Sequence, residues 1–132
     1  MSKIDSPDLR VYIVWVPLLS GDSLAAANEA SARLRGARVR HYWDEGGALG
    51  SAAGRALALP VRNGAPGETA FAWDVYLVYG PQATWQSPFP RPEFWMHRLM
   101  GIDAQFAQIF EGKALRDKVV ALLSAKPDAP RR

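Results

Sequence analysis

Apolar positions follow three different patterns in the first third of the chain. Residues 9–17, LRVYIVWVP, are apolar at almost every position, which is typical of a strand buried on both faces of a sheet. Residues 22–35 carry apolar and small side chains at helical spacing and end at Gly36, which predicts a helix. Residues 37–47 alternate between apolar and polar, which predicts a half-exposed strand near the edge of a sheet.

The rest of the chain continues in five segments: a helix over 47–58, a loop over 61–70, strands over 73–79 and 93–99, and a helix over 103–125. Gly50 and Gly54 weaken the first of these helices but would let it lie close to a sheet, and Gly112 could break the last one. The helix between the first two strands makes them parallel, whereas the helix-free connection suggests that the last two are antiparallel. The order β-α-β-α-β-β-α predicts an α/β protein built on a four-stranded mixed sheet.

The composition fits one domain over residues 1–132, with 1–8 and 126–132 as frayed tails. Of the 132 residues 48% are hydrophobic, an ordinary globular value. The chain contains no cysteine, which excludes disulfides, thiol nucleophiles and thiolate metal sites. The N-terminal residues lack the apolar run of a secretory signal, and no stretch approaches the ~20 apolar residues of a membrane span. We therefore expect a cytoplasmic protein without a membrane partner.

The formal net charge of +3 is mildly basic, and part of the excess lies in the segment RLRGARVR. Its arginines are Arg33, Arg35, Arg38 and Arg40. We interpret them as a solvated helix end and an edge strand protected by charge, with a phosphate-collecting patch as the alternative. The excess is too small, and no recognition module is present, so nucleic acid is not an expected partner.

The order of elements, with a first strand that ends in Trp15 before a turn and a helix, resembles the thioredoxin fold without its optional leading strand and helix. Val16 and Leu19 stand where that family has its Cys-x-x-Cys pair, and residues 72–74 stand where it has a cis-proline. The pattern YWD…AWDVYL…FWMH is also similar to uncharacterised bacterial thioredoxin-like proteins. The resemblance implies a three-layer sandwich, and the missing thiols exclude thiol–disulfide exchange.

In this topology the ends of all four strands bring side chains to one edge of the sheet, where ligands of open α/β sheets bind. The candidate ligand-binding residues are Trp15, Asp22, Trp43, Asp44, Trp73, Asp74 and His97. Together they would form an aromatic-walled polar pocket for a small ligand, a peptide or a divalent cation.

Each candidate also has a structural interpretation. Ser20 or Asp22 could cap the first helix, Asp44 could form a turn or cap the second, and Trp15 and Trp43 could simply pack. His41 is expected to be a hydrogen-bonded structural histidine. Asp74 opens an apolar strand, where a carboxylate needs backbone N–H partners or a cation, and His97 could pair with one of the acids.

A second unusual stretch, WQSPFPRPEFWMH, combines prolines with many large apolar side chains. Its candidate interface residues are Trp85, Phe89, Phe94 and Trp95, which fit a homodimer or docking to a larger protein partner. We expect a non-redox binding or protein-interaction module. It should have no cofactor and no metal ligand set that spacing can identify. The alternative is a small non-redox enzyme, metal-assisted, at the same edge, for which no catalytic residue can be named.

Overall fold

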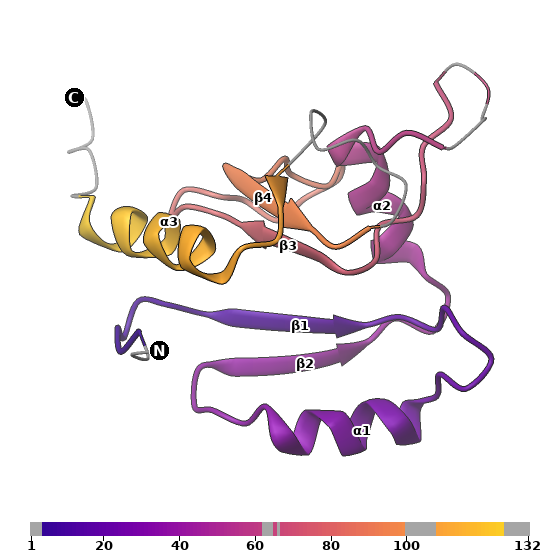
Figure 1. Ribbon diagram of the computed structural model, residues 1–132, viewed down its shortest axis with the longest axis horizontal. Helices are drawn as coiled ribbons and strands as arrows, with labels where there is room; N and C mark the ends of the chain where they lie inside the picture. Colours follow the sequence, from indigo (N-terminus) through magenta and orange to yellow (C-terminus); the bar gives the residue numbers. More distant parts are fainter. Residues whose placement is uncertain (1–3, 62–64, 66, 100–107, 126–132) are drawn as a thin grey trace.

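The computed structural model describes residues 4–61, 65, 67–99 and 108–125 (Figure 1). In this part of the chain the protein is mixed α/β, with three helices and two small sheets. The predicted order of elements is confirmed up to the fourth strand. Within the described residues no helix is long and apolar enough to cross a membrane.

The first sheet contains β1 (Val11–Trp15) and β2 (Val39–Trp43), which are parallel as predicted, with Val11 opposite Val39 and Trp15 opposite Trp43. Between them runs α1 (Leu24–Arg33), which is shorter than the predicted helix. Its N-cap is Ser23, whose hydroxyl accepts from the Ala26 N–H, and not Ser20 or Asp22.

Helix α2 (Ala48–Leu57) follows β2 and leads into the second sheet. That sheet has the order β3 (Val75–Val78), β4 (Phe94–His97) and β5 (Gln108–Ile109). Strands β3 and β4 are antiparallel as predicted, and β5 adds to β4 in parallel.

The C-terminal helix is shorter than predicted. Residues 103–107 of the expected helix lie outside the described residues, and Gln108–Ile109 is strand β5. Helix α3 (Gly112–Ser124) starts at the glycine expected to break it, because the Glu111 side chain accepts from the N–H groups of Lys113 and Ala114. A carboxylate cap thus defines where this helix begins.

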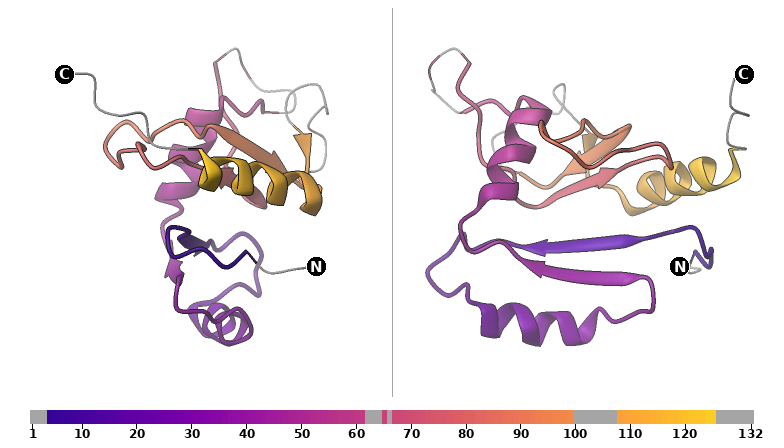
Figure 2. Two further views of the ribbon diagram at one scale, coloured as in Figure 1. Left: turned by 90° about the vertical axis from the view of Figure 1, so that its left-hand side faces the viewer. Right: turned by 180° about the vertical axis from the view of Figure 1, so that it is seen from behind.

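The predicted four-stranded sheet is not confirmed. In the described part of the chain, hydrogen bonds join β1 only to β2, and β3 only to β4. The spatial order is nevertheless β2, β1, β3, β4, with β1 lying between β2 and β3 in front and rear views (Figures 1 and 2). Strand β1 is therefore not the central strand predicted, nor is it fully buried, since Tyr12 is 54% exposed.

The core lies between α2 and the β3–β4 sheet. Its buried members are Ala53, Leu57, Leu59, Ala72 and Leu99, with Val75, Leu77, Phe89 and Trp95 packed against them. Glycines of α2 allow this contact at close range. A Cβ added at Gly50 would overlap the Phe71 ring, and one added at Gly54 would overlap the Ala70 carbonyl oxygen. The glycines thus allow α2 a close contact, but with the segment before β3 and not with the sheet as predicted.

Candidate functional site

An apolar pocket of about 160 Å³ lies where β1 faces α2 and the start of β3. Strand β1 contributes Tyr12 and Val14, Val16 follows directly after that strand, and β3 contributes Val75 and Leu77. Helix α2 contributes Leu49, Gly50 and Ala53, and the rest of the lining comes from residues 72–74 and Phe89. The pocket therefore occupies the gap in which β1 and β3 have no hydrogen bonds to each other.

Two of the predicted ligand-binding residues, Trp73 and Asp74, line this pocket. Asp74 has a positive φ of 48°, a conformation that aspartate tolerates better than most residues. Its Oδ1 accepts from the Tyr76 hydroxyl at 3.2 Å, and its backbone oxygen accepts from the Arg98 N–H. Burial raises the pKa of the Tyr76 hydroxyl, and the charge of Asp74 and this hydrogen bond raise it further.

Asp44 binds the start of α2. Its Oδ1 accepts from the Ala48 N–H at 3.0 Å, and its Oδ2 accepts from those of Leu49 and Gly50 at 2.8 and 3.3 Å. These donors are among those that a helix start leaves without partners. Both interpretations of Asp44 agree with the structure: its carboxylate binds the first N–H groups of α2, whose N-cap position is Gly47, and its backbone oxygen accepts from the Gly47 N–H at 3.0 Å in a turn.

Asp22 closes the turn after β1. Its Oδ2 accepts from the Leu18 and Leu19 N–H groups at 2.9 and 2.7 Å. The hydrogen bond from Leu19, followed by that from Leu18, lowers the pKa of this carboxyl below its ordinary value. The turn after β1 is thus held by a carboxylate at the position next to the helix cap.

Trp15 and Trp43 lie opposite each other at the ends of β1 and β2. The Trp15 indole stacks on His41, with ring centroids 6.1 Å apart, and its N–H donates to His41 Nδ1 at 3.2 Å. His41 Nε2 lies 3.1 Å from the Leu34 carbonyl oxygen, so the imidazole links β1, β2 and the end of α1. The interpretation of His41 as a structural histidine is confirmed.

His97 is 1% exposed and lies opposite Val75 in the sheet. Its Nδ1 accepts from the Leu99 N–H at 3.1 Å, which leaves the proton on Nε2. That nitrogen is buried and has no hydrogen-bond partner among the described residues. The imidazole is thus held by a backbone contact, and no carboxylate of the described chain binds it.

The structure therefore brings the candidates together only in part. Trp73 and Asp74 line one pocket, and the Asp44 N–H donates to the Trp15 carbonyl at 2.9 Å. Asp22 and Asp44 bind nearby backbone. Among the described residues, no group of three or more histidine and acidic side chains could hold a metal ion.

The candidate interface residues divide between two places. Trp85, which is 56% exposed, and Phe89 pack with Tyr79, at centroid distances of 4.8 Å for Tyr79–Trp85 and 5.4 Å for Trp85–Phe89. Burial raises the pKa of Tyr79 to about 12. Phe94 and Trp95 lie in β4, where both are half-buried.

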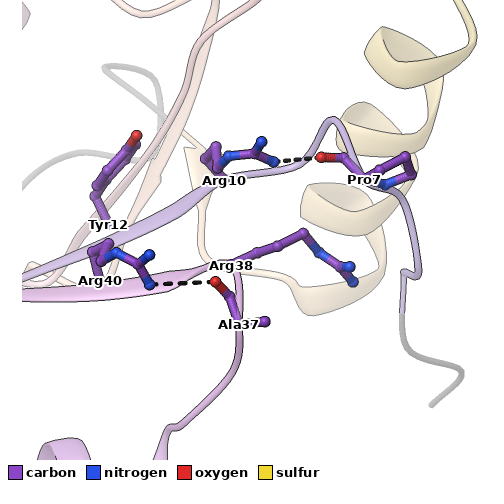
Figure 3. Close-up of a pocket in the computed structure, with 6 residues that line it drawn as sticks. All are labelled: Pro7, Arg10, Tyr12, Ala37, Arg38 and Arg40. Atoms are coloured by element: carbon purple, nitrogen blue, oxygen red, sulfur yellow. Dashed lines mark hydrogen bonds between the residues drawn. The ribbon is translucent and has the colours of Figure 1, made fainter.

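A basic hollow lies at the other end of β1 and β2. Two of its arginines, Arg38 and Arg40, belong to the segment for which a phosphate-collecting patch was the alternative interpretation, whereas Arg10 was not identified from the sequence. The hollow measures about 460 Å³ and is lined by Pro7, Arg10, Tyr12, Ala37, Arg38 and Arg40 (Figure 3). The signal was present, because Arg10 and Tyr12, like Arg38 and Arg40, occupy alternate positions at the starts of two neighbouring strands. Finding the hollow required the register that aligns Tyr12 with Arg40.

Comparison of the chain with protein-family models, with curated proteins and with solved structures gives no match.

Proposed function

We propose that this protein is a non-redox binding module whose working site is the apolar pocket between β1, α2 and β3. The observation that carries the proposal is the pocket itself, a space of about 160 Å³ walled by Val14, Val16 and Leu77 and flanked by Trp73 and Asp74. An engineered apolar cavity of about 150 Å³ holds a benzene molecule, so this space suits an apolar group of about that size.

The thioredoxin-like relationship remains part of this proposal. The spatial order β2, β1, β3, β4 supports it, as do the parallel first pair and the antiparallel second pair. A thioredoxin-like sheet would have β1 and β3 joined by hydrogen bonds. In this protein an apolar pocket lies in that gap, which suggests a site for binding and not for dithiol chemistry.

The test is saturable binding of the neutral dye N-phenyl-1-naphthylamine, whose benzene-sized phenyl ring is the group expected to enter the pocket, measured by its fluorescence increase. Val14→Trp fills the pocket and should weaken binding at least about tenfold, because the indole would occupy the volume the dye needs. Val120→Trp is the matched control: Val120 is on α3, 36% exposed, and outside the pocket lining.

Both variants are first checked by circular dichroism, and Val16→Trp provides a second filled pocket if Val14→Trp does not fold. Equal dye affinity in the wild type and in a folded pocket-filled variant would contradict the proposal.

The exposed aromatic Trp85 supports a second candidate function, docking of a protein partner or of a second copy of the chain. Its 56% exposure beside Tyr79 and Phe89 leaves a large apolar ring in contact with solvent. Analytical ultracentrifugation should then show concentration-dependent association that Trp85→Ser abolishes. A monomer at high concentration would rule out the homodimer.

A further inference from the structure

Strand β1 changes character along one of its faces. Alternate residues of an extended chain point to the same side, so Tyr12 and Val14 of β1 share a face with Arg10 just before the strand and Val16 just after it. From Arg10 to Val16 this face runs from cationic through aromatic to aliphatic over ~20 Å, at ~3.3 Å per residue. The apolar end lines the pocket described above, and the cationic end lines the basic hollow.

The basic hollow gathers cationic groups from both strands of the first sheet. Arg40 lies opposite Tyr12 in the register, and Arg38 accepts the Val11 N–H through its backbone oxygen, which places it beside the start of β1. The three guanidinium groups extend toward the same end of the two strands (Figure 3). The hollow is therefore a cationic site contributed by two segments that are distant in sequence.

Most of this charge is not neutralised within the described residues. Arg10 donates to the carbonyl oxygens of Pro7 and Leu9, and Arg40 to those of Ala37 and Val39. Only Arg38 contacts a carboxylate, that of Asp5 at 2.8 Å, whose side chain is 90% exposed. Guanidinium groups bind carboxylate and phosphate in pairs of parallel hydrogen bonds, so the hollow suits an anionic headgroup.

Tyr12 lines both spaces. The pocket and the hollow thus adjoin at one side chain, which is 54% exposed and whose ring lies 6.3 Å from that of Tyr42. An aromatic ring with a polar tip between a cationic and an apolar site offers contact to both parts of an elongated ligand.

We propose that the face of β1 binds one amphipathic anion, with its carboxylate or phosphate headgroup at Arg10 and Arg40 and its linear apolar tail past Tyr12 into the pocket. This inference rests on the proposed function, since the tail needs the apolar pocket. Charge complementarity determines the class of ligand: a neutral apolar molecule would leave the arginines unused, and a small anion would leave the pocket empty. A nucleic acid would use the arginines but not the aliphatic walls.

The test is displacement of bound N-phenyl-1-naphthylamine by decanoate, decyl phosphate, decanol and inorganic phosphate, all below micelle concentrations. We expect decanoate or decyl phosphate to bind at least about tenfold more tightly than decanol, because hydrogen bonds to charged groups stabilise a complex by more than ~1.4 kcal/mol, the equivalent of tenfold. Inorganic phosphate should displace no dye. The stronger of the two amphiphiles identifies the headgroup.

The double variant Arg10→Gln/Arg40→Gln should reduce the affinity for the anionic amphiphile to that for decanol. The matched control is Arg33→Gln/Arg35→Gln, which removes the same charge at the end of α1, outside the hollow. Equal affinity for decanoate, decyl phosphate and decanol in the wild type would overturn the headgroup site while leaving the binding pocket standing. Equal losses in the two double variants would overturn it as well. Absence of any dye binding would defeat the proposed function and this inference with it.

Discussion

At the scale of single residues, His97 shows how a buried polar side chain is held by one backbone contact. Its Nδ1 accepts from the Leu99 N–H, and its ring lies 5.8 Å from that of Trp95. Truncation to alanine would remove both the packed ring and the acceptor, and a buried N–H without an acceptor destabilises a fold.

We therefore expect His97→Ala to lower the free energy of unfolding by ~2–4 kcal/mol, measured by urea denaturation. His97→Asn keeps an acceptor two residues before the Leu99 N–H and should cost less. If both substitutions destabilise the protein equally, the Leu99 hydrogen bond is not what holds this residue.

Asp22 makes the turn after β1 sensitive to acid. Its pKa is lowered from 3.8 in the folded state by the hydrogen bonds from Leu19 and Leu18. A folded pKa below the unfolded one contributes stability that is present above pH ~4 and is lost as pH falls through the folded value. Asp22→Asn should therefore lower the melting temperature at pH 7 and differ less from the wild type at pH 2–3.

Thermal melts of both proteins from pH 2 to pH 7 measure this convergence. The comparable substitution Asp5→Asn at an exposed ion pair serves as the control, since exposed pairs stabilise little. A constant difference between Asp22→Asn and wild type at every pH would contradict the assignment.

At the scale of elements, the close packing of α2 depends on glycines, which have no side chain at the points of contact. The Gly50 carbonyl accepts from the Ala72 N–H, and the Leu59 carbonyl from the Ala70 N–H, so the segment before β3 lies directly against the helix. A methyl group at Gly54 would collide with the Ala70 carbonyl oxygen, which cannot move aside as a flexible side chain could.

Although alanine is the better helix former, we expect Gly54→Ala to destabilise the protein by ~2 kcal/mol or more. Gly46→Ala is the matched control, because a Cβ there would meet nothing within 4 Å. Chemical denaturation of both variants measures the difference. A neutral or stabilising Gly54→Ala would mean that the helix and the segment before β3 are not in this contact.

Local elements could be predicted from the sequence because their signals are local. The apolar run of β1, the alanine-rich α1 and the alternation of β2 follow from periodicity, and each appears with somewhat shorter bounds. Asp44 could be identified as a turn or cap residue, whereas Asp22, expected to cap α1, instead closes the turn before that helix. Their individual donors could not be identified, because these depend on the path of the chain after each strand.

At the scale of the whole molecule, the pairing of strands could not be predicted with the same success. Strands β1 and β3 are separated by about 60 residues of sequence, and nothing in their apolar patterns specifies whether they form hydrogen bonds with each other. The basic hollow could not be predicted for the same reason, since Arg10 and Arg40 line one hollow only because of the register of β1 with β2.

The orientation of the β1 backbone identifies which of its N–H groups have no strand partner among the described residues, because β1 and β3 are not hydrogen-bonded to each other. The Val11 N–H donates to the Arg38 oxygen, and the Trp15 oxygen accepts from the Asp44 N–H, so alternate residues of β1 bond to β2. In a parallel pair the residues between them point the other way. Tyr12 and Val14 therefore direct their N–H groups to the side of β1 away from β2, where the pocket lies and β3 follows.

Amide hydrogen exchange should consequently divide β1 in two. Ile13 and Trp15, held by β2, should exchange at least about tenfold more slowly than Tyr12 and Val14, whose N–H groups have no strand partner in the described structure. NMR-detected exchange of the free protein measures all four amides in one strand, so that Ile13 and Trp15 serve as internal references. Equal protection of the two sets would mean that β1 and β3 are joined by hydrogen bonds in solution. The four-stranded sheet predicted from the sequence would then be complete, and the space proposed for the ligand's tail would be closed.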